Sequence, residues 1–346
     1  MVQMNALKDR LKRMGASKAW LEGGLYRYYR LRWGKAYQRE LERREQLSLF
    51  AYRELAQNLP YAPEERVIDN NLYGYAQALK QYAGLQGDLR GYMEHGLYLG
   101  GIVHRDQYHW HYPRIITMSE ERREILAKAL PSKNALAVGP YIHYARSLYD
   151  EEKLKEIKQG LGRTLLVYPF HSMKGVKAQY RQADFIAEIQ RRRVDFDSVL
   201  VCLYYLDARE EALVRGYRKA GFKVLTAGHK FDRNFVRRMR THLELADVTM
   251  SNGVGTQTGF CLYLERPHYV FRQEIKQGVS KGPEWERHQQ SAGKGKRAAA
   301  EKQREEIAAL LVQYRENISS EQRTAIGRQW GFDQIRSPEA LRRLFS

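Results

Sequence analysis

Strand-like and helix-like segments alternate between residues 164 and 271, and this alternation constrains the fold more than any other feature of the chain. Five short apolar runs are separated by segments with helical spacing. A helix between consecutive strands predicts parallel strands joined by right-handed crossovers, and so an open, doubly wound α/β sheet. The predicted strands are 164–168, 198–205, 222–226, 248–250 and 268–271, and the predicted helices are 174–193, 208–220, 233–245 and 255–264.

A shorter alternation precedes this region. Residues 89–93, 114–118 and 135–138 have the composition of strands, and residues 73–85 have helical spacing. The chain has 346 residues, which is long enough for two domains of ordinary size. We predict a basic helical arm (1–58), a first Rossmann-like domain (59–150), a second Rossmann-like domain (151–275) and a polar helical tail (276–346) that begins with a loose linker.

The net charge of +19 narrows the classes of partner. Nucleic acid, an anionic membrane surface and phosphorylated substrates all attract such a chain. Residues 1–48 alone carry a net charge of +7, and arginines interleave with tyrosine, tryptophan and leucine in this arm. Such a segment can lie on an anionic lipid surface, or it can pack on the body with a solvated basic face.

The N-terminal residues, the apolar runs and the cysteines indicate the compartment and the relation to the membrane. The N-terminus is charged and has no apolar signal-peptide core, and the longest apolar run, near residues 199–206, is far shorter than a membrane span. Cys202 and Cys261 lie in apolar segments and are expected to be buried and reduced. We therefore expect a cytoplasmic protein that associates peripherally with the inner membrane.

Polar residues and glycines follow the strands of the second domain. Ligands of open parallel sheets bind outside the carboxyl ends of the strands, so these residues mark the expected site. The opposite ends are less specialised, and the acidic pair Asp195 and Asp197 falls there, where a solvated turn is expected. The residues at the expected edge are His171, Ser172 and Lys174, then Gly228, His229 and Asp232, then Ser251 and Asn252.

The turn between the predicted strand 248–250 and the helix that follows predicts an anion site. Ser251, Asn252 and Thr256 surround a helix N-terminus, where unpaired N–H groups and the helix dipole favour a phosphate. An ordinary capped turn without a ligand fits the same residues. The chain has no Walker motif and no dinucleotide fingerprint after a first strand, so the expected phosphate belongs to neither class of nucleotide site.

A glutamate and a group of three histidines are further candidates for chemistry. Glu94 follows a predicted strand of the first domain, where a carboxylate facing a cleft can act as a general base and a hydrogen-bonded loop glutamate is the alternative. His104, His109 and His111 could bind a metal, but no cysteine or clear acidic partner stands at ligand spacing, so surface histidines are favoured and no metal is predicted.

Together these motifs resemble the two-Rossmann-domain (GT-B) glycosyltransferases that assemble bacterial capsule and O-antigen. The stretches Gly228-His229-x-x-Asp232-x-x-Phe235 and Ser251-Asn252-x-x-Gly255-Thr256 are similar to the donor-nucleotide half of such enzymes. Asn71-x-Tyr73-Gly74, Glu94-His95-Gly96 and Gly139-Pro140-Tyr141 are similar to the acceptor half. The resemblance covers roughly residues 65–271 and part of the tail.

The resemblance implies a metal-independent enzyme without a cofactor that moves a sugar from a nucleotide-sugar donor to a glycan or polyprenyl-phosphate-linked acceptor. The closest analogy is to transferases of CMP-activated sialic acid or Kdo, although Ser172 stands where those enzymes have proline after histidine. The implied catalytic residues are Glu94, His171 and His229; the donor residues are Ser172, Lys174, Gly228, Asp232, Ser251, Asn252, Gly255 and Thr256; the acceptor residues are Asn71, Tyr73, His95 and Tyr141. The alternatives are a basic nucleic-acid-binding protein and a non-catalytic member of a polysaccharide assembly complex.

Overall fold

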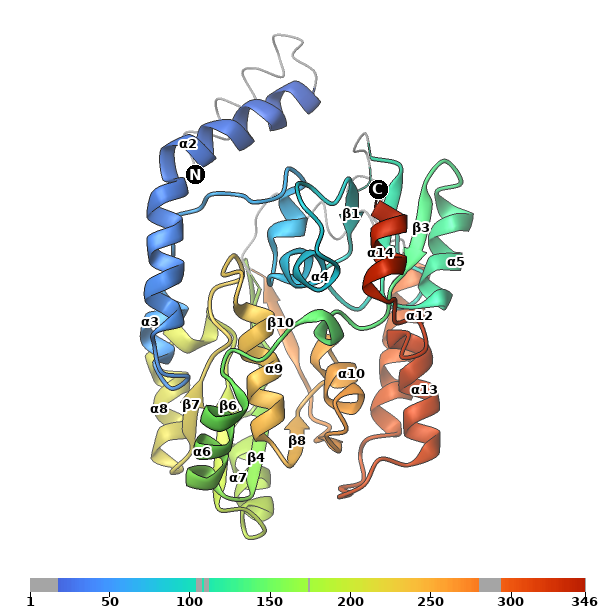
Figure 1. Cartoon of the computed structure of the whole chain (residues 1–346). Coiled ribbons are helices and arrows are strands. Elements are labelled where there is room, and N and C mark those ends of the chain that lie inside the picture. Colours follow the sequence, from blue (N-terminus) through green and yellow to red (C-terminus); the bar gives the residue numbers. More distant parts are fainter. Residues whose placement is uncertain (1–17, 104–107, 109–111, 174, 280–293, 346) are drawn as a thin grey trace.

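The chain folds into an α/β structure with two parallel sheets (Figure 1). The computed structural model describes residues 18–103, 108, 112–173, 175–279 and 294–345. The larger sheet has the order β7-β6-β4-β8-β9, with every neighbouring pair parallel. Its strands are β4 (Thr164–Tyr168), β6 (Ser198–Cys202), β7 (Lys223–Leu225), β8 (Val248–Ser251) and β9 (His268–Val270). All five lie within the runs predicted from the sequence or, for β8, extend one by a residue.

The crossovers of this sheet are helical, as the sequence pattern predicts. Their apolar positions are buried against the sheet, for example Phe185 and Ile189 of the first and Val214 and Tyr217 of the second. The helices are α7 (Gln182–Arg193), α8 (Glu211–Lys219), α9 (Phe235–Leu245) and α10 (Thr256–Tyr263), with α6 (Glu151–Leu161) before β4.

The smaller sheet has the order β1-β2-β3 and is also parallel. Its strands are β1 (Gly91–Met93), β2 (Arg114–Thr117) and β3 (Asn134–Ala137), accompanied by α4 (Tyr75–Ala83) and α5 (Glu120–Ala129). Short 3₁₀ helices span Ile68–Asn71 and Tyr141–Tyr144. Ser119 caps α5 by accepting a hydrogen bond from the N–H of Arg122, as expected for serine before two glutamates.

One predicted helix is wrong over its first turns. Residues Val176–Gln179 form strand β5 rather than the start of α7, and they pair antiparallel with β10 (Lys276–Val279), which was expected to be a loose linker. The two strands are about 100 residues apart, and local spacing carries no signal for such a distant partner. In the sequence β5 follows β4 and β10 follows β9, so this two-stranded ribbon comes directly after the carboxyl ends of two strands of the large sheet.

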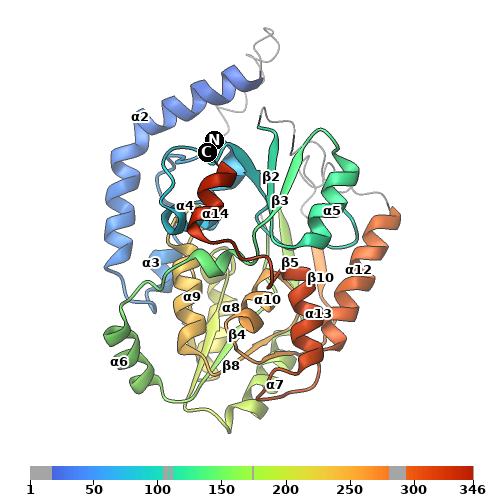
Figure 2. The same ribbon diagram turned by 45° about the vertical axis from the view of Figure 1, so that its right-hand side comes forward.

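The N-terminal arm is one long helix, α2 (Lys18–Glu45), followed by α3 (Tyr52–Ala56). Its C-terminal half packs on the body, because the fully buried Arg44 reaches the carbonyl oxygen of Leu55 at 3.1 Å and Tyr37 donates to the carbonyl oxygen of Phe231 at 2.9 Å. The N-terminal end of α2 stands away from the body in both views (Figures 1 and 2), and farther along the helix Leu31 is 89% exposed while Tyr29 packs against Tyr61. Among the described residues, no helix combines the length and apolar character needed to cross a membrane.

The tail is helical, as predicted, and it joins the two sheets. It consists of α12 (Lys294–Ala309), α13 (Ser320–Trp330) and α14 (Pro338–Phe345). Helix α13 packs on both α10 and α5, and α14 packs on α4. The indole N–H of the buried Trp330 donates to the carbonyl oxygen of Thr256 at 3.0 Å. One hydrophobic cluster therefore contains residues from both sheets and from the tail.

Candidate functional site

The carboxyl ends of the two sheets meet at a line of aromatic rings. His95 follows β1, and its ring centroid lies 6.3 Å from that of Tyr73. The Tyr73 hydroxyl is 3.3 Å from the hydroxyl of Tyr204, which follows β6. The ring of Tyr204 lies 4.6 Å from the ring of His171, which follows β4. These contacts join the carboxyl edges of the two sheets in one continuous chain of side chains, His95–Tyr73–Tyr204–His171, which we call the cleft line because it lies between the sheets.

Tyr73 has a strained backbone at the centre of this line. Its φ of +60° lies in the left-handed region, which aromatic residues rarely adopt. Both of its backbone groups are held by the segment from β7 to α9: its N–H donates to the carbonyl oxygen of Lys230 at 2.7 Å, and its carbonyl oxygen accepts from the N–H of Val236 at 3.1 Å. Strain that surrounding contacts hold in place is concentrated at functional sites, so Tyr73 supports this location.

The N-terminus of α10 lies beside the same surface. The Thr256 hydroxyl oxygen accepts a hydrogen bond from the N–H of Leu97 at 3.1 Å, which ties the helix end to the segment that follows β1. Gly255, Thr256 and Gln257 are all partly exposed. Within the described part of the chain, the amide N–H groups of Thr256 and Gln257 have no acceptor. Such groups at the positive end of a helix can bind a phosphate.

The structure corrects the expected role of Ser251 and Asn252, whose side chains point into the fold. The Ser251 hydroxyl is fully buried between the carbonyl oxygen of Gly253 and the imidazole of His268, each at 2.9 Å. The Asn252 amide oxygen accepts from the N–H of Phe170 at 2.6 Å. These side chains shape the turn and link β8 to the end of β4, so only backbone groups remain to face an anion.

Glu94 is also placed differently from the expected base facing a cleft. Its carboxylate is 1% exposed and accepts hydrogen bonds from the hydroxyls of Tyr108 and Thr117 at 2.5 and 2.7 Å. The guanidinium of Arg122 adds further bonds at 2.6 and 3.1 Å. A carboxylate that is buried and saturated with donors is a structural ion pair, because any proton it accepted would have to displace these partners.

His95, the neighbour of Glu94, has a partly exposed side chain. Its Nδ1 atom is buried and has no hydrogen-bond partner in the described residues. Burial is the main cause that lowers its pKa below the usual 6.5, partly opposed by the charges of Asp69 and Glu94. The imidazole is therefore neutral at pH 7 and able to accept a proton.

Among the remaining residues expected in the second half of the site, His171 is exposed, whereas Ser172, Asp232 and His229 are buried. His171 is exposed at the cleft line. Ser172 is held by Asp207, whose carboxylate accepts from its N–H at 2.9 Å. Asp232 is completely buried and lies 2.8 Å from the guanidinium of Arg238. His229 is buried, and burial, followed by the charge of Arg209, lowers its pKa to about 3.

Gly228 belongs to the same scaffold. Its φ of +101° favours glycine, and a Cβ at this position would come within 3.0 Å of the Arg238 guanidinium. Asp232, His229 and Gly228 therefore hold the loop after β7 in place.

Two of the expected acceptor residues are structural. The Asn71 side chain accepts from the N–H groups of Glu64 and Glu65 at 2.7 and 2.9 Å, so it closes its own loop. Tyr141 is fully buried and donates to the carbonyl oxygen of Ile116 at 3.3 Å. Tyr73 and His95 are the expected acceptor residues that reach the cleft line.

Lys174, His104, His109 and His111 are outside the described residues. Asp195 and Asp197 are exposed at the amino edge of the large sheet, as expected for a solvated turn. Across the part of the chain that the structure describes, no group of three or more histidine, cysteine or acidic side chains is placed to hold a metal ion.

Tyr204 is the cleft residue that sequence reasoning missed, because it was read as the end of an apolar strand. Its position directly after β6, at the same sheet edge as His171, is the signal that could have identified it. Comparison with known proteins adds no assignment: no family model and no curated protein matches this chain.

Proposed function

We propose that the protein is a metal-independent glycosyltransferase of the GT-B type, which binds a nucleotide-sugar donor between the two parallel sheets. The observation that carries the proposal is the cleft line, which brings the carboxyl ends of both sheets to one surface beside the N-terminus of α10. Ligands of open parallel sheets bind at these ends. A donor on one sheet and an acceptor on the other would therefore lie face to face.

In this proposal the α10 N-terminus holds the donor phosphate. When the bond between the sugar and the phosphate oxygen breaks, negative charge develops on the leaving nucleotide. The amide N–H groups of Thr256 and Gln257 are aimed at this charge without any reorganisation, so they stabilise the transition state more than the ground state. His171, at the end of β4, is available to donate a hydrogen bond to the same phosphate.

His95 acts as the general base in place of Glu94. The acceptor hydroxyl loses its proton to the partly exposed imidazole of His95 as its oxygen bonds to the anomeric carbon. Neutral histidine is suited to this step near pH 7. The acceptor is a glycan carried by a polyprenyl phosphate. The exposed, basic first half of α2 supports contact with the anionic membrane surface where such a lipid resides.

A nucleotide screen tests the proposal. Thermal unfolding is measured with CMP, UDP and GDP and with their sugar conjugates. A ligand that binds only the folded protein at a concentration 100 times its Kd stabilises it by about 2.7 kcal/mol, and so raises its Tm. We expect one nucleotide family to raise the Tm and its sugar conjugate to raise it further. If all of them leave the Tm unchanged, the protein is not a nucleotide-sugar transferase.

The pH dependence of transfer tests His95. Because its pKa lies below 6.5, His95 stays neutral as pH falls to 6.5 and becomes protonated only below that value. We expect kcat/KM to fall on the acid side, with an apparent pKa below 6.5. The His95→Gln variant should lose about 10²–10⁴-fold in rate while keeping donor affinity. The base lies elsewhere if His95→Gln retains both the wild-type rate and the wild-type acid limb.

A further inference from the structure

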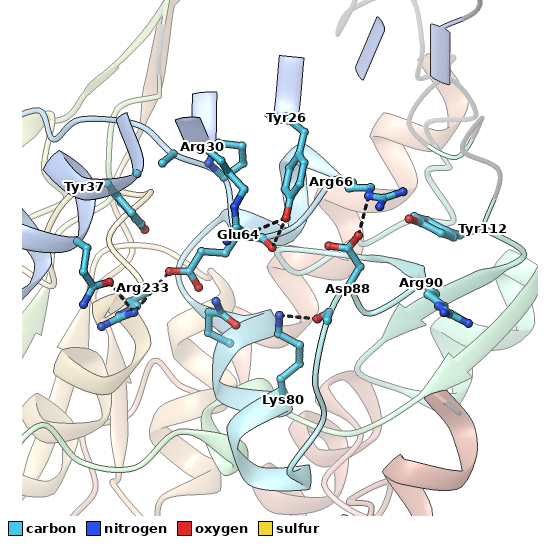
Figure 3. A pocket seen from close by; sticks show the side chains of 16 residues that line it. Tyr26, Arg30, Tyr37, Glu64, Arg66, Lys80, Asp88, Arg90, Tyr112 and Arg233 are labelled. Atoms are coloured by element: carbon cyan, nitrogen blue, oxygen red, sulfur yellow. Dashed lines mark hydrogen bonds and ion pairs between the residues drawn. The ribbon is translucent and has the colours of Figure 1, made fainter. Parts of the chain in front are cut away.

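A cavity of about 760 Å³ lies between α2 and α4, and none of its lining residues belongs to the cleft line (Figure 3). Its walls come from α2, the segment 62–66, α4, the loop before β1, Tyr112 before β2 and Arg233 before α9. The volume is within the range of small-ligand sites. The cavity is lined by five cationic side chains, Arg30, Arg66, Lys80, Arg90 and Arg233, and by only two acidic ones, Glu64 and Asp88.

Part of this positive charge is neutralised inside the protein. Arg66 is paired with Asp88 at 3.0 Å, and Arg233 lies 3.6 Å from Glu64. Lys80 is paired with the buried Glu65. A carboxylate partner therefore exists for three of the five cations.

Arg30 and Arg90 supply the surplus charge. Arg30 donates to the hydroxyl of Tyr26 at 2.8 Å, and neither arginine has a carboxylate partner in the described part of the chain. In Figure 3, Arg66, Arg90 and Tyr112 gather on one side of Asp88, whereas Tyr26 and Arg30 lie above it. Guanidinium groups around a concave site match the geometry of a phosphate, which they bind through paired N–H donors.

The backbone of Arg90 is a second, independent observation. Its φ of +49° lies in the left-handed region, where glycine is favoured and other residues are strained. Gly87, at the start of the same loop, adopts φ +74°. A long cationic side chain at a position where glycine costs less indicates that the charge itself is used.

We propose that this cavity binds the phosphate group of a second ligand, separate from the nucleotide phosphate at α10. The ligand is a phosphate ester, either free or as a lipid headgroup. Helix α2 contributes Arg30 to the cavity and carries the exposed Tyr28 and Leu31 nearby, so a headgroup could reach it from a membrane surface. This site does not depend on sugar transfer, and it holds whether or not the protein is a transferase.

The test compares two double variants with the same change in charge. Arg30→Gln with Arg90→Gln removes the surplus charge and leaves every carboxylate of the cavity with its partner. Arg215→Gln with Arg218→Gln removes two exposed arginines of α8 and serves as the control. Binding of inorganic pyrophosphate is measured by calorimetry at two salt concentrations. The proteins also carry Gly255→Asp, which places a carboxylate at the α10 N-terminus, so that only the cavity is measured.

We expect the parent protein and the control to bind pyrophosphate alike, and the Arg30/Arg90 variant to bind at least tenfold more weakly. Arg90→Gly should weaken binding without lowering the Tm, because it removes the charge and relieves the backbone strain. This single change keeps the test valid if the double variant unfolds. Equal pyrophosphate affinity in the Arg30/Arg90 variant and the control would overturn the proposal, as would the absence of any binding to the parent protein.

Vesicle sedimentation distinguishes the two sources of phosphate. Phosphatidylcholine vesicles with and without phosphatidylglycerol are mixed with the same proteins. Weaker sedimentation of the Arg30/Arg90 variant than of the control with phosphatidylglycerol assigns the cavity to a lipid headgroup. Equal sedimentation of both, together with the loss of pyrophosphate binding, assigns it to a free phosphate ester. Either result supports a phosphate site in the cavity.

Discussion

Replacing Gly255 by aspartate is expected to abolish nucleotide binding while leaving the fold intact. Gly255 precedes α10 with φ −148° and ψ −174°, an extended conformation open to any residue. A Cβ there would meet the end of the Gln257 side chain, which can move aside. Aspartate is a favoured N-cap residue and interacts well with the helix dipole, so the variant should be as stable as the wild type or slightly more stable.

The new carboxylate would occupy the place of the phosphate. Two negative charges about 4 Å apart repel by about 4 kcal/mol at the effective dielectric of a protein surface. We therefore expect nucleotide affinity to fall by about 100-fold or more. Ser319→Asp is the matched control, because Ser319 caps α13 and the change adds the same charge at another helix start. Equal calorimetric Kd values for Gly255→Asp and the control would show that the N-terminus of α10 does not bind the nucleotide phosphate.

Replacing Arg122 by methionine is expected to cause a large loss of stability. Arg122 and Glu94 are paired in the interior, with side chains that are 6% and 1% exposed. Removal of one partner leaves the other charge buried and unpaired, which typically lowers the free energy of unfolding by about 3–5 kcal/mol. We expect a decrease of this size in the free energy of unfolding, measured by urea denaturation. Arg123→Met on the same helix is the control, because the side chains of its pair with Glu120 are 36% and 45% exposed and such a pair contributes at most about 1 kcal/mol.

A double-mutant cycle separates the pair from the packing of its members. Glu94→Gln combined with Arg122→Met removes both charges, so the double variant should recover much of the stability lost by Arg122→Met alone. A cost below 1 kcal/mol for Arg122→Met would contradict the burial of the pair. The cycle also bears on activity measurements, since Glu94→Gln can lose transfer activity because the fold is less stable rather than because a base is missing.

The sequence predicted the large sheet well because its strands and helices alternate locally. Residues such as Thr164–Tyr168 and Ser198–Cys202 are continuous apolar runs, as expected for parallel strands buried on both faces. The ribbon of β5 and β10 was missed because its strands come from distant parts of the chain, and neither is apolar enough to be recognised alone.

The sequence predicted the site at the carboxyl edge of the sheets, and that site remains a prediction. The structure brings His171, His95 and Tyr73 together in the cleft line, with Thr256 beside it. The side chains of Ser251 and Glu94, which were expected to face a ligand, are buried and hydrogen-bonded inside the protein, because residue type and spacing do not reveal which way a side chain points. Their hydrogen-bond partners, His268 and Arg122, come from other elements, and only the folded chain brings them together.

The central claim is that a nucleotide-sugar binds between the two sheets with its phosphate at the N-terminus of α10. A crystal structure with the nucleotide that most raises the Tm tests it directly. The account predicts a phosphate oxygen within hydrogen-bonding distance, about 2.7–3.2 Å, of the amide nitrogen of Thr256 or Gln257, with the sugar facing His95. A nucleotide bound away from α10, whether in the cavity beside α2 or elsewhere, would contradict it.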